Sequence, residues 1–145
     1  MSPLLRSICG KYRFRVEIDG IQQAGFREVE GIEVNIEAQE YREGTDPHLS
    51  FEKIPGLVRY TPIVLKSAIT PNMELFNWIY QVIQGKIVKK NMAVIVVDRE
   101  GNDAFRVEFN GAWPSGWRLG KPDSHSSSPL IEELTIQYDS LRRVK

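Results

Sequence analysis

The chain has 145 residues, of which 41% are hydrophobic and 26% are charged, as is typical of an ordinary soluble globular protein. Lysine plus arginine and aspartate plus glutamate both number 19, so the formal net charge is zero and a general polyanion-binding surface is not indicated. We expect residues 1–145 to form one domain, with residues 1–10 as a flexible or interface arm.

The N-terminal region carries no targeting signal that we recognise. Residues 1–14 contain no apolar run long enough for a signal peptide, and Pro3 and Arg6 interrupt them. No stretch of the sequence approaches the roughly 20 apolar residues that span a bilayer. Cys9 is the only cysteine, so no intramolecular disulfide is expected. We therefore expect assembly in the cytosol, and export by a route without a peptide signature stays open.

The first third of the chain predicts three strands. Residues 12–18 alternate between apolar and polar side chains, Asp19-Gly20 is a turn signal, and a short strand over 24–30 ends at Gly31. Residues 32–43 then alternate over twelve positions, whereas a typical strand has about 5–6 residues. Because a long regular strand at a sheet edge invites aggregation, this one is expected to have a partner.

A helix is predicted over 70–84. Before it, Pro55-Gly56 interrupt the mixed segment 48–60, and residues 61–69 are typical of a strand. Thr70 suits the N-cap, Pro71 the first helical position and Gly85 the C-terminal cap. Apolar residues recur at helical spacing and predict a packing face: Leu75, Trp78, Ile79, Val82 and Ile83.

The remainder of the chain predicts further strands. Residues 91–98 form a continuous apolar run, which predicts a strand covered on both faces, followed by a hairpin turn around Gly101-Asn102. Strands over 104–113 and 130–141 flank a corner at 114–120 and a polar loop at 121–129. The expected fold is mainly β: two packed antiparallel sheets, as a β-sandwich or partly open barrel, with one flanking α-helix.

We find no constellation that predicts catalysis. His48 and His125 lie in polar loops without a metal-ligand spacing, and the adjacent Asp123, Ser124 and His125 cannot adopt a nucleophile–base–orienter geometry. No glycine-rich phosphate loop, GxSxG or CxxC is present. The sequence therefore predicts no enzyme activity, no metal and no cofactor.

Six segments, in order and over nearly the whole chain, resemble the inner tube proteins of contractile phage tails and contractile injection systems. The most specific elements are Glu-Tyr-Arg-Glu-Gly, Pro-Gly-Leu and Ala-Trp-Pro. The segments are "YRFRVEIDG", "AGFREVEGIEVNIEAQEYREG", "KIPGLVRYTPIVLKSAIT", "LFNWI", "NGAWPSGW" and "IEELTIQYDSL".

The resemblance implies hexameric rings that stack into a hollow tube inside a contractile sheath, with one sheet of each subunit joining a barrel around the channel. It implies as partners other copies of the chain, the sheath protein, baseplate or tube-initiating and terminator proteins, and a cargo of protein effectors or DNA. The particle is a phage tail or a phage tail-like particle, released or anchored in an envelope. Phage tail and injection system stay open, as do main tube protein and tube-initiating ring.

Two sets of residues are candidates for assembly. Apolar residues without a period in the loop after the long strand predict contacts between subunits, for which the candidates are Tyr41, Arg42, Phe51, Ile54 and Leu57. The resemblance places the long strand near the channel, so the candidates for the channel lining are the residues of its polar face, Glu33, Asn35, Glu37 and Gln39. A sheath-facing position for this polar face stays open, and a monomeric small-ligand-binding β-barrel is the alternative function.

Overall fold

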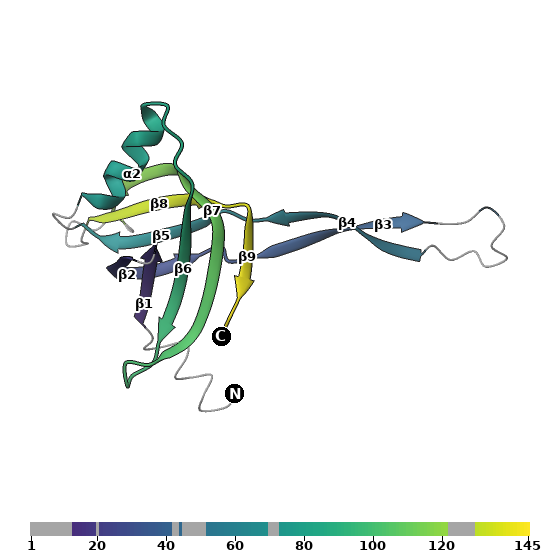
Figure 1. Cartoon of the computed structure of the whole chain (residues 1–145), viewed down its shortest axis with the longest axis horizontal. Helices are drawn as coiled ribbons and strands as arrows, with labels where there is room; N and C mark the ends of the chain where they lie inside the picture. The colour runs from purple at the N-terminus through teal and green to yellow at the C-terminus, as the bar shows by residue number, and fades with distance from the viewer. Residues whose placement is uncertain (1–12, 20, 42–43, 45–51, 70–72, 122–129) are drawn as a thin grey trace.

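The computed structural model describes residues 13–19, 21–41, 44, 52–69, 73–121 and 130–145. The described elements are one helix and nine strands (Figure 1). They are β1 (Arg13–Ile18), β2 (Ile21–Glu30), β3 (Val34–Tyr41), β4 (Glu52–Tyr60), β5 (Ile63–Ala68), α2 (Glu74–Ile83), β6 (Lys90–Val97), β7 (Asp103–Gly120), β8 (Ile131–Gln137) and β9 (Ser140–Arg143).

Seven strands form one antiparallel sheet that curls back on itself. Their order is β6-β1-β2-β5-β8-β7-β9, and β6 also pairs with β7. In Figure 1, β5 and β8 run across the view. β1, β6 and the first part of β7 cross their direction at a steep angle. The result is a partly open barrel whose two layers enclose a core, which confirms the expected mainly β fold.

Two long strands belong to both layers and form the corners. β2 pairs with β1 up to Phe26 and with β5 from Phe26 onward, with a register shift after Phe26. β7 pairs with β6 up to Ala112 and with β8 from Trp113, again with an irregularity after Pro114. Such bulges bend a strand and let it change sheets. The predicted corner at 114–120 is therefore the second half of one 18-residue strand.

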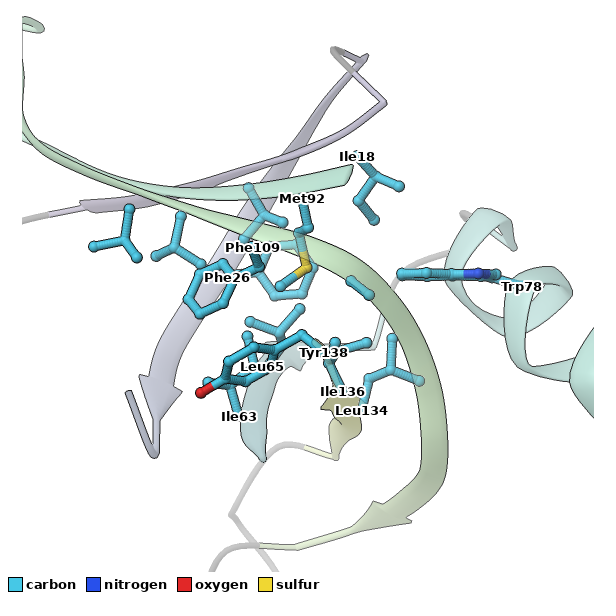
Figure 2. Close-up of a cluster of buried hydrophobic side chains, with 14 of the residues drawn as sticks. Ile18, Phe26, Ile63, Leu65, Trp78, Met92, Phe109, Leu134, Ile136 and Tyr138 are labelled. Carbon is cyan, nitrogen blue, oxygen red and sulfur yellow. The ribbon is translucent and has the colours of Figure 1, made fainter. Parts of the chain in front are cut away.

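The core lies between the two layers (Figure 2). Tyr138 packs edge-on against Phe109, with ring centroids 4.9 Å apart, and its hydroxyl donates a hydrogen bond of 2.7 Å to the carbonyl of Thr61. Because the hydroxyl has a hydrogen-bond partner, burying it in the core costs little free energy of folding. Other core residues are Val16, Ile18, Phe26, Ile63, Leu65, Met92, Val94, Val107, Leu134 and Ile136.

Strand β6 is covered on both faces, as its apolar run predicts. Met92 and Val94 lie in the core, and Ala93 and Ile95 are also buried, although they lie on the opposite face of the strand. By register, Ile95 lies between Arg15 and Arg106 of the neighbouring strands. The aliphatic parts of long charged side chains can cover apolar surface in this way.

Helix α2 starts later than predicted. It spans Glu74–Ile83, and its N-cap Met73 makes no capping hydrogen bond through its side chain. Residues 70–72, including the predicted Thr70 cap, lie outside the described residues. The predicted packing face is confirmed at Trp78 and Ile79, which are buried, but Ile83 is 68% exposed and does not belong to it. Gly85 ends the helix with a φ of 89°, a conformation that glycine adopts without strain.

Two further expectations need correction. Pro55-Gly56 do not interrupt the segment before β5, because β4 runs through both residues. A proline is tolerated there because β4 belongs to a two-stranded sheet and has a free edge. The strand predicted over 24–30 is longer, since β2 starts at Ile21. The turn around Gly101 is confirmed, with Asp98 Oδ1 accepting from the backbone N–H groups of Glu100 and Asn102.

Candidate inter-subunit surfaces

The predicted long strand is one half of a hairpin that extends away from the curled sheet (Figure 1). β3 pairs only with β4, in register from Val34 opposite Tyr60 to Tyr41 opposite Glu52. Every described residue from 31 to 41 is exposed. The long strand therefore has one partner within the chain, but no layer formed by the described residues covers either face of the hairpin.

One face of this hairpin is apolar and exposed. Ile36 lies opposite Val58, and Val34 precedes it on the same face. Their side chains are exposed by 57% for Ile36, 48% for Val58 and 40% for Val34. Alternation alone would be typical of a face that packs on a core, but this face lies outside the core because the hairpin leaves the curled sheet. A contiguous apolar strand surface without cover is typical of a surface that binds a partner.

A bulge interrupts the hairpin at Gly56 and Leu57, which together lie opposite Glu37. A Cβ atom on Gly56 would lie 2.9 Å from the carbonyl oxygen of Glu37, so only glycine fits there without a shift of the strand. The next side chain, Leu57, is 65% exposed. The bulge thus presents a large apolar side chain to the outside.

The polar face of the hairpin holds all four predicted channel residues. Glu33, Asn35, Glu37 and Gln39 are exposed. The Asn35 amide donates a hydrogen bond of 3.0 Å to Glu33, and Arg59 lies opposite Asn35 in the register. These residues share a face, as the period-two pattern predicts, and their position in an assembly stays a prediction.

The predicted inter-subunit residues are only partly described. Tyr41, Ile54 and Leu57 lie on the hairpin and are exposed. Arg42 and Phe51 lie outside the described residues, as does the N-terminal arm. The structure therefore brings three of the five candidates to one hairpin, and the contacts they make in an assembly stay a prediction.

A second surface was missed by the sequence analysis. The second halves of β2 and β7, together with β5 and β8, form a four-stranded layer in the order β2-β5-β8-β7. Among the described residues, none pairs with the outer edge of β2 from 27 to 30, or with the outer edge of β7 from 113 to 120. This layer therefore has two open edges, which only strand pairing could have revealed.

The face of this layer that points away from the core carries a row of alternating charges. Glu28 lies opposite Lys66, Lys66 opposite Glu133, and Glu133 opposite Arg118. The Lys66 ammonium is 4.0 Å from Glu28, 3.8 Å from Glu133 and 3.0 Å from Glu30. The row therefore crosses all four strands, from Glu28 at one open edge to Arg118 at the other.

The contacts of Lys66 shift the ionisation of two groups. Its hydrogen bond to Glu30 lowers the pKa of that carboxyl, helped by a contact with Glu28 and by the charge of Lys66. The same hydrogen bond to Glu30 raises the pKa of Lys66. Both groups are charged at neutral pH, so the row keeps its alternation there.

The described residues show few features of a metal-binding or ligand-binding site. They contain no cluster of three or more histidine, cysteine, aspartate or glutamate side chains that could hold a metal ion. His48 and His125 lie outside them. One depression beside the curled sheet has a volume of about 480 Å³, and Arg106 in its lining is already paired with Glu17 and Glu108 at 3.0 and 3.3 Å. The described part of the chain contains no helix that is long and apolar enough to cross a membrane.

A family model settles the relationship that the motifs suggested. The model of the T4-like virus tail tube protein gp19 matches residues 10–142. The chain belongs to this family. This match confirms the resemblance to tube proteins that the sequence motifs indicated. The matched residues include the β3–β4 hairpin and both open edges of the four-stranded layer. No match is found among curated protein sequences.

Solved structures share the fold over most of the chain. A chain from the extended sheath–tube complex of an extracellular contractile injection system, PVC, has 23% identity and a TM-score of 0.78, covering 99% of this chain and 98% of that chain. A chain from the tube-terminating cap of the anti-feeding prophage has 22% identity and a TM-score of 0.78, covering 93% and 89%. Hcp1 from Flavobacterium johnsoniae has 16% identity and a TM-score of 0.56, covering 90% and 94%.

Proposed function

We propose that the chain is a structural subunit of the inner tube of a contractile phage tail or contractile injection system, without enzymatic activity. The observation that carries this proposal is the β3–β4 hairpin, which is exposed on both faces and has one apolar face. Membership of the tail tube family agrees with it. A hairpin with an uncovered apolar face promotes aggregation of a monomer, whereas in an assembly the same face binds a neighbouring subunit.

The four-stranded layer supports a closed ring. Its strands are antiparallel throughout, so β2 and β7 at the two edges run in opposite directions. When the β7 edge of one subunit pairs with the β2 edge of the next, the antiparallel alternation continues without a break. Head-to-tail contacts of this kind form a ring when the rotation between neighbours closes, and a closed barrel leaves no edge exposed. Six subunits, as the family resemblance implies, give one continuous barrel.

The same geometry indicates which face of the four-stranded layer lines the channel. β1, β6, the first half of β7 and α2 lie on the core side of the layer, where Trp78 and Phe109 are buried. Six copies of these strands and helices do not fit inside the barrel. The core side of the layer therefore faces outward, and the charged face lines the channel. We extend the proposal to the polar face of the hairpin, with Glu33, Asn35, Glu37 and Gln39 towards the lumen. The apolar face then packs on a neighbouring subunit.

The proposed partners follow from the proposed place in the particle. Similar chains come from a sheath–tube complex and from a tube-terminating cap. We propose contacts with a sheath protein outside, with baseplate and terminator proteins at the ends, and with protein effectors or DNA as cargo in the lumen. Assembly takes place in the cytoplasm, and the completed particle is released or anchored in an envelope.

Sizing at several concentrations, followed by negative-stain imaging, tests the tube against the monomeric ligand-binding barrel. The tube predicts rings or tubes from the purified chain, or tubes in particles from cells that co-express the baseplate. A strict monomer under both conditions contradicts the tube. The filled space between the layers, with Leu65, Phe109 and Ile136 fully buried, disfavours a ligand cavity.

The channel assignment of the hairpin has its own test, Glu33→Lys combined with Glu37→Lys. If this face lines the lumen, tubes form and the sheath docks, while the loading or ejection of cargo changes, because the channel charge changes sign there. Naked tubes that fail to recruit sheath contradict the assignment and support a sheath-facing hairpin. Exchanging Asn35 for Gln is the matched control.

A further inference from the structure

We propose that the row of alternating charges on the four-stranded layer continues across the subunit boundary, with Arg118 of one copy paired to Glu28 or Glu30 of the next. The partner is thus a second copy of this chain, bound head to tail. The inference rests on the proposed function, because it assumes that the two open edges meet in a ring. It adds the contact that sets the direction and the register of that meeting.

The order of the charges along the row favours this contact. Within one subunit, the row reads Glu28, Lys66, Glu133, Arg118, each opposite the next in the strand register. It therefore begins with a carboxylate at the β2 edge and ends with a guanidinium at the β7 edge. Placed head to tail, copies of this row give an unbroken alternation of negative and positive charge, without any change in the order.

The terminal groups of the row have fewer partners of opposite charge than Lys66 in its middle. Inside the row, Lys66 contacts three carboxylates. At the β7 edge, Arg118 is exposed, and no described carboxylate forms an ion pair with it. At the β2 edge, Glu28 forms a long ion pair of 4.0 Å with Lys66, beside its contact with the Glu30 carboxyl. Opposite charges on facing strands stabilise the pair, so the free ends of the row are complementary.

The charges at the two edges also disfavour the pairing of like edges. Beside Glu28, the β2 edge also carries Glu30, and beside Arg118, the end of β7 is followed by the exposed Lys121. A two-fold pair of β7 edges would bring cations together, and a two-fold pair of β2 edges would bring carboxylates together. Like charges on facing strands are destabilising. The edges thus oppose closed dimers and favour the head-to-tail contact that builds a ring.

Cysteine cross-linking tests the geometry directly. In a Cys9→Ser background, Glu28→Cys and Arg118→Cys are combined in one chain, and tubes are treated with an oxidant or with a short bis-maleimide. The expected result on a denaturing gel is a ladder of covalent multimers that ends at the subunit number of the ring. Each single-cysteine variant is expected to remain monomeric. A dimer from either single variant would show that like edges meet and would overturn the inference.

Charge substitution tests the same contact without cysteines. Arg118→Glu is expected to raise the concentration needed for assembly by about tenfold or more, which corresponds to about 1.4 kcal/mol per interface. Arg118→Lys keeps the charge and is expected to assemble nearly as the wild type does. The matched control is Arg99→Glu, which reverses an exposed arginine on the turn between β6 and β7, far from both edges. Equal assembly of Arg118→Glu and Arg99→Glu would overturn the inference.

The outcomes separate this inference from the proposed function. If wild-type tubes form and neither experiment gives the expected result, the inference fails and the proposed tube subunit stands. If the wild-type chain forms no ring or tube, alone or co-expressed with its baseplate, both fail together. Thermal unfolding of the Arg118→Glu monomer shows whether the substitution acts on the fold, and an unchanged transition is expected for this exposed side chain.

Discussion

The curled sheet and the β3–β4 hairpin are built from the same alternating pattern, yet their apolar side chains have opposite fates. In the curled sheet, Val16 and Val94 lie opposite each other and are fully buried. In the hairpin, Ile36 and Val58 also lie opposite each other, and each is about half exposed. Both pairs are adjacent valine or isoleucine residues on antiparallel strands. They differ only in whether a second layer of the chain covers them.

This difference shows that strand patterning specifies a face but not what covers it. Burying a valine or isoleucine side chain contributes about 1.5–3 kcal/mol. The curled sheet gains this free energy when the chain folds, whereas the hairpin leaves it for association. A tube subunit has reason to divide its apolar surface in this way, because the monomer must fold before it assembles.

The largest expected effect on folding comes from the core of the curled sheet. Trp78→Ala is expected to lower the free energy of unfolding of the monomer by about 3–5 kcal/mol, because the indole is buried and leaves a cavity. The indole N–H also donates a hydrogen bond of 3.3 Å to the carbonyl of Val88. Denaturant unfolding measures the loss. On the same helix, Ile83→Ala is the control, with a side chain that is 68% exposed, and a similar loss for both would contradict the assigned packing face.

A smaller effect is expected where the two regions meet. Thr61 lies between β4 and β5, and its carbonyl accepts the hydrogen bond from Tyr138. Tyr138→Phe removes only the hydroxyl and is expected to cost about 1 kcal/mol. Burial raises the pKa of Tyr138, so the wild type is also expected to lose stability as pH rises above about 10, where an unfolded tyrosine ionises. Thermal unfolding at pH 7 and pH 11 measures both effects. If Tyr138→Phe lost as much stability between these two pH values as the wild type, Tyr138 would not be the cause of the loss.

The hairpin is expected to show the reverse behaviour. Ile36→Ser combined with Leu57→Ser should change the free energy of unfolding of the monomer by no more than about 0.5 kcal/mol, since both side chains are exposed. Assembly should fail, because the apolar face loses its contacts with the neighbour. Sizing and negative-stain imaging measure assembly beside the unfolding curve. Normal tubes from the double variant would show that this face stays uncovered in the particle.

Much of the fold could be predicted from the sequence, because its signals are local. The apolar run of β6, the turn at Gly101 and the packing face of α2 each follow from short patterns. The start of the helix could not be placed in this way, because Thr70 and Pro71 suit an N-cap and a first helical position three residues before the observed ones. A good capping residue predicts a helix start without fixing it.

The candidate surfaces were predictable only in part. The polar face of β3 follows from alternation, so Glu33 and Glu37 were found together. The row through Lys66 was not found, because its four charges come from residues 28, 66, 118 and 133, which only strand pairing brings side by side. For the same reason, the sequence could not show that β2 and β7 each have one paired half and one open half. Long-range register is not encoded in a short pattern.

The smallest expected effect concerns the charges of Lys66, which belong to the curled sheet but face away from its core. Lys66 donates a hydrogen bond of 3.0 Å to Glu30, and this contact lowers the pKa of Glu30 and raises that of Lys66. The lowered carboxyl pKa gives stability that is present above its unfolded value, about pH 4, and is lost as pH falls through the folded value. The raised ammonium pKa gives stability that is present below about pH 10 and is lost as pH rises through the folded value.

Lys66→Gln is therefore expected to be slightly less stable than the wild type across this window, and the difference should vanish in strong acid. It should also shrink in about 1 M salt, because exposed ion pairs are screened there. The measurement is the difference in Tm between the two proteins as a function of pH and salt. Lys86→Gln, at an exposed position after α2, is the control that should show no such profile. A difference that persists in acid and in high salt would mean that the aliphatic part of Lys66 stabilises the sheet by packing, and that its charge serves assembly alone.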